Sequence, residues 1–497
     1  METTHEQSES DAHRAAAARR WRPGRQCGRL LLLAAALVLV AGLRLHSRRE
    51  PLEGDEATYM MGARLWRQGE EPYSRLWDNK PIGTYVVYRA GIALFGYNEL
   101  TPRWLSLAAV LLSTLVLAWW LWPRRLPVLA AGLLVLWPPL SVWVPAFANG
   151  GNIEVFLLPF ILAAAAMLDR FLQTERYGWW LGAAAAVSGS LLLKQVTLPF
   201  VFMLAVPLAV VYARARGRRH LLLLSVVALA GMVVVLHVGL YMLCGFGPAF
   251  AWEQFIENTQ YSSGDAGLPA RLLKWFELGA TCLFARATLP LLPLSLATAG
   301  AVVLLWYCRG RRRALLLLSF AVSSIGAVII PGISREHYAI LLLPLLAMGT
   351  LVFLELLPRG VATRGAFAAL ALYLGACSWH YYLGRTPTEI CQWKYGGPRF
   401  NADRKIGRLL RDRGITDSRI YVEGSHAPIY FYSRNMPAIP YHCAYTVAIG
   451  VVDRPGMMAL LRRAAPRYLV FLNPRPSLPG MPAWRQAHYR LVFSLRG

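Results

Sequence analysis

EGDEATY at residues 53–59 and DNKP at residues 78–81 follow the first apolar segment of the chain. Two adjacent carboxylates, Asp55 and Glu56, therefore lie where the chain leaves a membrane, and Lys80 follows on the same side. Nearly everything downstream consists of long apolar segments, so chemistry at a membrane face would depend on polar residues such as these.

The composition is that of a polytopic helical membrane protein. Of 497 residues 56% are hydrophobic, 17 are Trp, and the mean hydropathy is +0.39, whereas soluble domains are roughly 45–50% apolar. The net charge of +25 comes largely from arginines in short runs between apolar segments, which is typical of cytoplasmic loops and favours contact with anionic lipid headgroups. No nucleic-acid motif is present, so no nucleic acid is expected as a partner.

The apolar segments predict about eleven transmembrane helices, because each crossing needs about 20 residues. The predicted spans are 30–43, 104–122, 126–144, 153–168, 179–193, 197–211, 221–243, 280–306, 315–330, 338–356 and 366–382. The first could instead be a signal peptide, but arginines follow it and no cleavage site is obvious. Every strongly basic turn then falls on one side, with the N-terminus cytoplasmic and the C-terminus outside.

Three regions are predicted. Residues 1–28 form a cytoplasmic arm, residues 29–383 a transmembrane catalytic domain, and residues 384–497 a small extracytoplasmic α/β domain. Residues 44–81 make the first external loop, where Asp55 is expected to cap a helix from Glu56 to about Gln68. Residues 81–96 are too short to cross and predict a helix lying in the interface.

The C-terminal region alternates between helices and strands. Helices are expected at 400–413 and 455–464, and strands at 419–422 and 468–472. No glycine-rich nucleotide motif occurs. The seven cysteines show no metal-ligand spacing, and either Cys391–Cys443 or Cys244–Cys282 could be a disulfide, although free buried thiols are as plausible.

Asp55 and Glu56 are the first candidates for chemistry. A carboxylate can accept the proton of a hydroxyl group as that group forms a new bond, and partial desolvation at the membrane boundary can raise the basicity of the carboxylate. The alternative is that Asp55 only caps its helix and Glu56 only interacts with the helix dipole.

Cationic residues on the same predicted face could hold a phosphate. Lys80 can serve as a point-charge phosphate ligand, or it can reach to lipid headgroups. Arg335, His337 and Tyr338 lie in a short external turn, in which Arg335 could instead pair with Glu336. At the outer ends of two spans, Glu154 could be functional or could cap its helix, and Lys194 could be functional or reach to headgroups.

The segments 54–59 and 78–81 resemble the first external loop of the GT-C superfamily, in particular the dolichyl-phosphate-mannose protein mannosyltransferase and aminoarabinose transferase-like group (glycosyltransferase family 39-like). The turn 335–338 with Pro344 is similar to a late polar turn of that family. In topology the resemblance covers about residues 30–383. Departures from the family pattern are Ile82, where a second proline is usual, and Asn79, where a relative has an acidic residue.

The resemblance implies an inverting glycosyltransferase that uses a polyprenyl-phosphate-linked sugar. By analogy, Asp55 is the base and Glu56 its neighbour, whereas Lys80, Arg335, His337 and Tyr338 hold the donor phosphate. Glu154, Lys194, Asp78 and Tyr59 are secondary candidates. No cofactor or metal ligand is predicted, and a requirement for a divalent metal stays open.

The sequence therefore predicts transfer of a sugar to an unidentified lipid, glycan or protein acceptor on the extracytoplasmic face of a bacterial inner membrane. A transporter or flippase for lipid-linked glycans is the alternative, but such proteins usually show repeated halves or charges near mid-membrane. A non-catalytic scaffold that presents the C-terminal domain would not explain the polar loop cluster.

Overall fold

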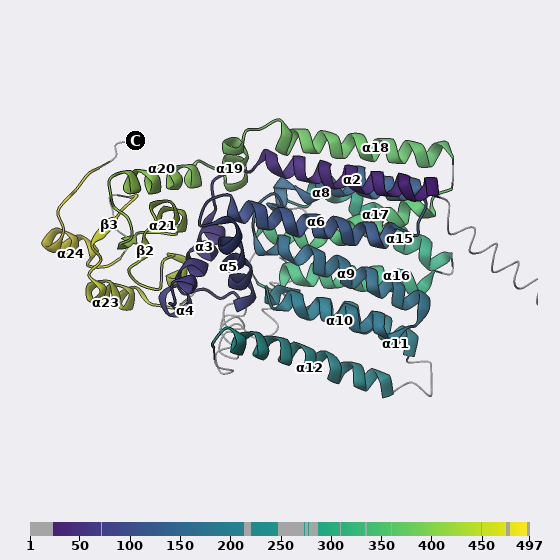
Figure 1. Ribbon diagram of the computed structural model, residues 1–497, viewed down its shortest axis with the longest axis horizontal. Coiled ribbons are helices and arrows are strands. Elements are labelled where there is room, and N and C mark those ends of the chain that lie inside the picture. Colours follow the sequence, from purple (N-terminus) through teal and green to yellow (C-terminus); the bar gives the residue numbers. More distant parts are fainter. Residues whose placement is uncertain are drawn as a thin grey trace, which may run out of the picture.

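The computed structural model describes residues 23–70, 72–212, 220–246, 287–308, 310–332, 335–358, 360–448, 450–473 and 478–494, together with positions 273 and 277. Figure 1 shows a bundle of long, roughly parallel helices with a smaller α/β part at one end. Helix α2 begins at the opposite end of the bundle from this α/β part. This arrangement is consistent with an odd number of membrane crossings between the start of α2 and the α/β part.

Eight helices of the described chain are long and apolar enough to cross a membrane. They are α2 (Pro23–His46), α6 (Thr101–Leu121), α9 (Ile153–Thr174), η3 with α11 (Gln195–Tyr212), α12 (His220–Leu243), η5 with α15 (Leu289–Tyr307), α16 (Arg311–Ile329) and η6 with α17 (Glu336–Leu356). The prediction of a polytopic helical membrane protein is thereby confirmed.

The three other predicted spans are shorter or interrupted. Residues Leu126–Ser141 form α7 (Leu126–Ala130), a π-helical turn η1 (Ala131–Leu136) and α8 (Trp137–Ser141). Helix α10 (Tyr177–Leu191) has 15 residues, and α18 (Val361–Ser378) continues into η7 (Trp379–Leu383). All three lie along the same bundle (Figure 1), and the count of eleven crossings stays a prediction.

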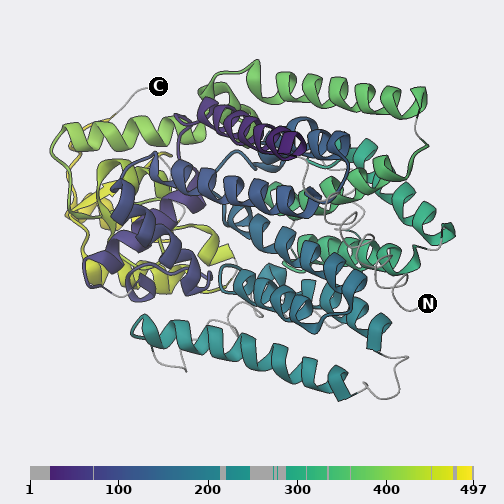
Figure 2. The same cartoon turned by 45° about the vertical axis from the view of Figure 1, so that its right-hand side comes forward.

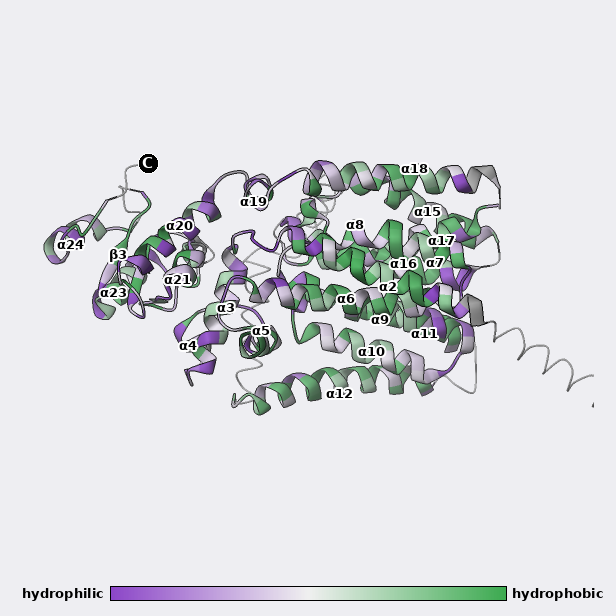
Figure 3. Ribbon diagram, turned by 45° about the horizontal axis from the view of Figure 1, so that its top comes forward, coloured by the Kyte–Doolittle hydropathy of each residue, from purple (hydrophilic) through white to green (hydrophobic). Residues whose placement is uncertain are grey.

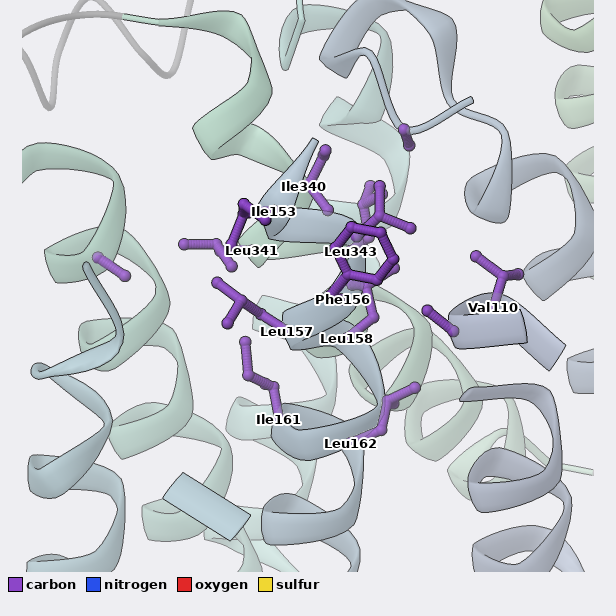
Figure 4. Packing of buried hydrophobic residues seen from close by; sticks show 14 of the residues in the cluster. Val110, Ile153, Phe156, Leu157, Leu158, Ile161, Leu162, Ile340, Leu341 and Leu343 are labelled. Atoms are coloured by element: carbon purple, nitrogen blue, oxygen red, sulfur yellow. The ribbon is translucent and has the colours of Figure 1, made fainter. Parts of the chain in front are cut away.

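Helix α9 is at the centre of the bundle. Its side chains Ile153, Phe156, Leu157, Leu158 and Ile161 pack among Val110 of α6 and Ile340, Leu341 and Leu343 of η6 and α17 (Figure 4). Helix α12, in contrast, is apolar along its length (Figure 3) and leaves large side chains such as Leu223 and Val235 exposed. In water this exposure would be costly, so it indicates contact with lipid.

At the end of the bundle away from the α/β part, charged residues from three helices and from the turn between α6 and α7 are joined. Asp169 accepts hydrogen bonds from Arg313 Nε at 2.8 Å and from Arg124 Nη2 at 3.3 Å, and Arg124 also pairs with Glu355. All four residues lie in or beside turns that the sequence assigns to the cytoplasmic side. Their meeting in space supports the predicted order of crossings.

The first external loop forms three helices at the other end of the bundle: α3 (Gly54–Arg67), α4 (Pro72–Arg75) and α5 (Ile82–Phe95). Helices α3 and α5 run crosswise to the spanning helices (Figure 1). The predicted cap is wrong, because Glu53 is the N-cap and the helix begins at Gly54. The Glu53 carboxylate accepts from the Glu56 N–H at 3.0 Å, and the Glu56 carboxylate accepts from the Glu53 N–H at 3.2 Å.

The C-terminal part contains a parallel sheet of three short strands in the order β2-β1-β3. The strands are β1 (Arg419–Val422), β2 (Met436–Pro437) and β3 (Tyr468–Val470). The helices are α19 (Pro387–Tyr395), α20 (Arg399–Asp412), α21 (Ala427–Ser433), α22 (Tyr445–Ala448), α23 (Arg454–Ala464) and α24 (Met481–His488). The predicted alternation of helices and strands is therefore present.

The first external loop and the C-terminal part share buried contacts, and their ribbons interleave in Figure 2. Lys394 Nζ lies 2.8 Å from Glu50 Oε1, with both side chains at most 2% exposed. The Tyr432 hydroxyl accepts from the Leu52 N–H at 2.9 Å. Of the predicted cysteine pairs, Cys391 and Cys443 are free and buried, and Cys282 lies outside the described residues.

Candidate active site

Asp55 lies in the first turn of α3, and within the described chain its carboxylate has no hydrogen-bond or ion-pair partner. Burial acts to raise the pKa of Asp55, but positive charge nearby outweighs it, and the pKa lies below its usual value. This charge comes, in decreasing order of effect, from Lys80, His337, Lys194 and Arg335. The carboxylate is therefore ionised, and its oxygens are available to another molecule.

Glu56 is in the opposite situation. Its side chain is 1% exposed and forms a buried ion pair with Arg103, whose Nη2 lies 3.0 Å from Oε2. Glu56 Oε1 also accepts from the Gly151 N–H, which fixes the loop between α8 and α9 against α3. Both oxygens of Glu56 are thus engaged in protein contacts, so the geometry assigns Glu56 to holding the site together and leaves Asp55 as the accessible carboxylate.

Lys80 is held at the start of α5 by its own neighbours. Its Nζ donates to Asn79 Oδ1 at 2.7 Å and lies 3.3 Å from Asp78 Oδ1. Asp78 is buried and also accepts from the Tyr85 hydroxyl at 2.8 Å and from the Asn79 N–H at 2.9 Å. Asp78 therefore positions Lys80, and it places one compensating negative charge beneath the ammonium group.

Glu154, Lys194, His337 and Tyr338 come from three separate elements and meet at the same end of the bundle. Lys194 pairs with Glu154, and His337 Nε2 lies 3.8 Å from Glu154 Oε1. The Lys194 ammonium is 4.8 Å from the centre of the Tyr338 ring. Lys194 is 4% exposed, so it does not extend to lipid headgroups, and Glu154 forms an ion pair in place of a helix cap.

Arg335 is exposed and does not pair with Glu336, which is also exposed; in the described chain neither forms an ion pair. The alternative in which these two residues neutralise each other therefore has no support. The Arg335 charge still contributes to lowering the pKa of Asp55. An exposed guanidinium beside an unengaged carboxylate is well suited to contacting an anionic ligand.

Tyr59, a secondary candidate, lies inside an aromatic cluster. It is 1% exposed, with ring centres 5.3 Å from Tyr88 and 6.5 Å from Tyr85. Burial raises its pKa well above the usual value, so the phenol keeps its proton. Tyr59 lies on α3 and packs this helix, which also carries Asp55, against α5.

Three residues that contact the segments around Asp55 and Lys80 were missed from the sequence: Arg103, Pro440 and His442. Arg103 stands at the start of a span, where a charge is costly unless it is paired, and this signal could have identified it. His442 Nε2 lies 3.0 Å from Thr58 Oγ1, one turn along α3 from Asp55, and Pro440 O accepts from the Trp77 N–H at 3.1 Å. The loop containing Pro440 and His442 thus joins α3 to the segment before Lys80. No local sequence pattern predicts this contact.

Among the residues that the structure describes, no three His, Cys, Asp or Glu side chains cluster as metal ligands would. The cations near Asp55 are Lys80, Lys194 and Arg335. Asp78 and Glu154 offset the charges of the two lysines, whereas Arg335 has no ion pair in the described chain. An exposed guanidinium of this kind can attract a phosphate group.

Comparison with known proteins points to one class. Residues 79–240 match the family described as dolichyl-phosphate-mannose-protein mannosyltransferase. The structure is similar to that of ArnT from Cupriavidus metallidurans bound to undecaprenyl phosphate, with a TM-score of 0.54 and 18% identity over 82% of this chain and 85% of that chain. The apo form of the same ArnT gives a TM-score of 0.54 and 16% identity over 88% and 91% of the two chains.

A comparison with curated protein sequences gave no match. The family match and the ArnT-like fold confirm the predicted resemblance to the membrane glycosyltransferases of the GT-C superfamily. The particular reaction of this chain has to be argued from its own residues.

Proposed function

We propose that this chain is a multi-pass membrane enzyme that transfers a sugar from a polyprenyl-phosphate donor to an acceptor, with inversion, at the extracytoplasmic face. The observation that carries the proposal is Asp55, an ionised carboxylate without a bonding partner in the described chain, surrounded by cationic side chains. A proton acceptor beside an anion-binding group is what such a transfer needs.

In this mechanism the acceptor hydroxyl attacks the anomeric carbon of the donor sugar while Asp55 removes the hydroxyl proton. A bond forms between the acceptor oxygen and the anomeric carbon, and the bond from that carbon to the phosphate oxygen breaks. The electron pair of the broken bond goes to the phosphate. Lys80 and Arg335 stabilise this developing charge, because they lie on the same side and neither is fully buried.

His337 and Lys194 form the inner wall of the phosphate site. Lys194 is tied to Glu154, so this pair contributes little net charge, and His337 offers a hydrogen bond. Tyr338, close to both, shapes the wall. A lipid-linked donor suits a site at the end of apolar helices, and the undecaprenyl phosphate present in one ArnT structure supports the same class of carrier.

The membrane orientation follows from charge. Arginine-rich turns gather at the end of the bundle away from Asp55, and such turns stay in the cytoplasm. The proposal therefore places the N-terminus in the cytoplasm of a bacterium and both the site and the C-terminal domain outside its inner membrane. The alternative of a transporter is disfavoured, because the buried charges of the described spanning helices, Arg44, Arg103, Glu154 and Asp169, lie towards the ends of those helices.

The test is transfer of labelled sugar from polyprenyl-phosphate donors in isolated membranes. Asp55→Asn is expected to reduce the rate about 10²–10⁴-fold, the usual contribution of a general base. Glu336→Gln is the matched control, because it removes an exposed carboxylate on the same face that has no ion pair in the described chain. Full activity of Asp55→Asn, or equal loss in both variants, would contradict the assignment.

A further inference from the structure

Two pockets lie on either side of Arg434, where α3 and α4 meet the C-terminal part. The first, of about 290 Å³, is lined by residues of α3 and α4 and by residues next to β1 and β2. The second, of about 270 Å³, lies between the segment after α5 and helices α20 and α21. Arg434 lines both, and Arg64 connects them, since it donates to Arg434 O at 2.9 Å and lies 5.1 Å from the Tyr97 ring centre.

Both pockets are strongly basic. Six arginines line them: Arg64, Arg75, Arg408, Arg411, Arg419 and Arg434. Among the described residues, three carboxylates do so, namely Glu70, Glu99 and Asp417. Arg411 also pairs with Asp412, which is outside the lining. The described residues at this surface therefore carry more positive than negative charge, and they come from segments more than 300 residues apart in sequence.

The carboxylates present do not saturate these arginines. Asp417 is 66% exposed where it pairs with Arg64, and Glu70 lies 2.9 Å from Arg75 and 3.7 Å from Arg419. Exposed pairs of this kind contribute only about 0–1 kcal/mol each. An arginine has five N–H donors in a planar fork that fits phosphate and carboxylate groups, so an incoming anion can add to or displace these pairs.

Arg434 is the central element of this lining. Its backbone φ of 62° ends α21, and its carbonyl is fixed by Arg64. Its side chain is exposed and has no hydrogen bond or ion pair among the described residues. The arrangement holds one unneutralised guanidinium at the junction of the two pockets.

We infer that the two pockets bind an acidic glycan, the anionic part of the acceptor, through its phosphate or carboxylate groups. This inference rests on the proposed function. Arg64 follows Asp55 by nine residues on α3, which at 1.5 Å per residue places the pockets roughly 13 Å from the base along the helix. One elongated acceptor can reach both.

The experiment measures binding to the purified full-length protein by calorimetry, with tripolyphosphate and trigalacturonate as anionic probes and maltotriose as the neutral probe. Arg419→Gln with Arg434→Gln removes two of the lining guanidiniums. Arg454→Gln with Arg463→Gln is the matched control, since both residues are exposed, lie on α23 outside the pockets and have no ion pair in the described chain.

At least one anionic probe should bind to the wild type, and maltotriose should not displace it. The pocket variant should bind this probe at least tenfold more weakly than the wild type. The control variant should bind it with unchanged affinity. Binding of tripolyphosphate would indicate that the pockets recognise phosphate groups, and binding of trigalacturonate would indicate that they recognise carboxylate groups. Absence of binding to the wild type, equal losses in the two variants, or affinity only for anionic lipid in nanodiscs would overturn the inference. A melting temperature of the pocket variant equal to that of the wild type shows that the variant is folded.

The two proposals fail separately. If anion binding depends on Arg419 and Arg434 but no donor supports transfer, the inference about the pockets stands and the proposed function is wrong. If transfer requires Asp55 but no anion binds at the pockets, the proposed function stands and the inference about the pockets is wrong.

Discussion

Glu56→Gln and Asp55→Asn are expected to damage this protein in different ways, although each replaces only one oxygen by nitrogen. Glu56 faces N–H donors from Arg103, Gly151 and Glu53. In the amide, one acceptor becomes an NH₂ group that points at other donors, and the Arg103 charge loses its partner. Asp55 has no bonding partner to lose in the described chain.

The magnitude follows from the burial of the ion pair. Arg103 and Glu56 side chains are 6% and 1% exposed, and removing one member of such a pair costs about 3–5 kcal/mol. The surroundings cannot compensate, because Arg44 is also buried there and Glu50 is already paired with Lys394. Asp55→Asn loses a helix-dipole interaction, worth about 0.3–1 kcal/mol, and the attraction of nearby cations, but it also no longer buries a charge. These last two effects oppose each other, so the net loss of stability should be smaller than for Glu56→Gln.

Thermal unfolding of the purified variants in detergent, read together with sugar transfer, checks this reasoning. Glu56→Gln should lower the melting temperature by roughly 5–10 °C, since 1 kcal/mol shifts it about 2–4 °C in chains of 150–250 residues and less in longer ones. Asp55→Asn should melt like the wild type and fail in transfer. A Glu56→Gln variant that is as stable as the wild type would refute the assigned role of the ion pair.

Three other outcomes are expected. Lys80→Gln removes the cation that most lowers the pKa of Asp55, so the pKa of Asp55 should rise. The acidic limb of the pH–rate profile should then move to higher pH by about one unit. If this limb does not move, Lys80 does not act on the residue that serves as the base. Burial lowers the pKa of His442 to about 4, so stability should fall as the pH drops from about 6.5 towards 4, by about 2 kcal/mol between pH 7.5 and 5; His442→Gln should lack this loss in denaturant titrations. Gly151→Ala would place its Cβ 2.9 Å from Pro102 Cβ and 3.0 Å from Glu56 Oε1, and should cost about 1–3 kcal/mol, whereas Gly178→Ala, with nothing within 4 Å, should be neutral or stabilising in the same measurement.

Local patterns predicted the elements well. The strand at Arg419–Val422 has the predicted bounds, and the helix predicted at 455–464 begins one residue earlier, at Arg454. Hydropathy predicted the spans because lipid requires apolar length, whatever the neighbouring helix is. The interruption of the helix within Leu126–Ser141 was harder to predict, because Pro138 and Pro139 lie inside an otherwise apolar run.

Pairings across the fold could not be predicted. The cap was misassigned to Asp55 because Glu53 and Glu56 cap the helix reciprocally, with a glutamate where such boxes usually have Ser or Thr. The partner of Glu56 is 47 residues away and that of Thr58 is 384 residues away. A single sequence contains no signal for such distances, so the distinction between an anchoring Glu56 and an accessible Asp55 emerged only from the structure.

The buried ion pair of Glu50 with Lys394 has a consequence for synthesis. Its partners are 344 residues apart, and at 5–20 residues per second the second is made roughly 17–70 s after the first. In the proposed membrane orientation, the first external loop is already on the far side of the membrane during that interval, and Glu50 still lacks its partner Lys394. Asp55, the proposed base, would then acquire its final surroundings only after α19, which carries Lys394, has been made. A chain whose translation stops before α19 should therefore present the loop but be inactive.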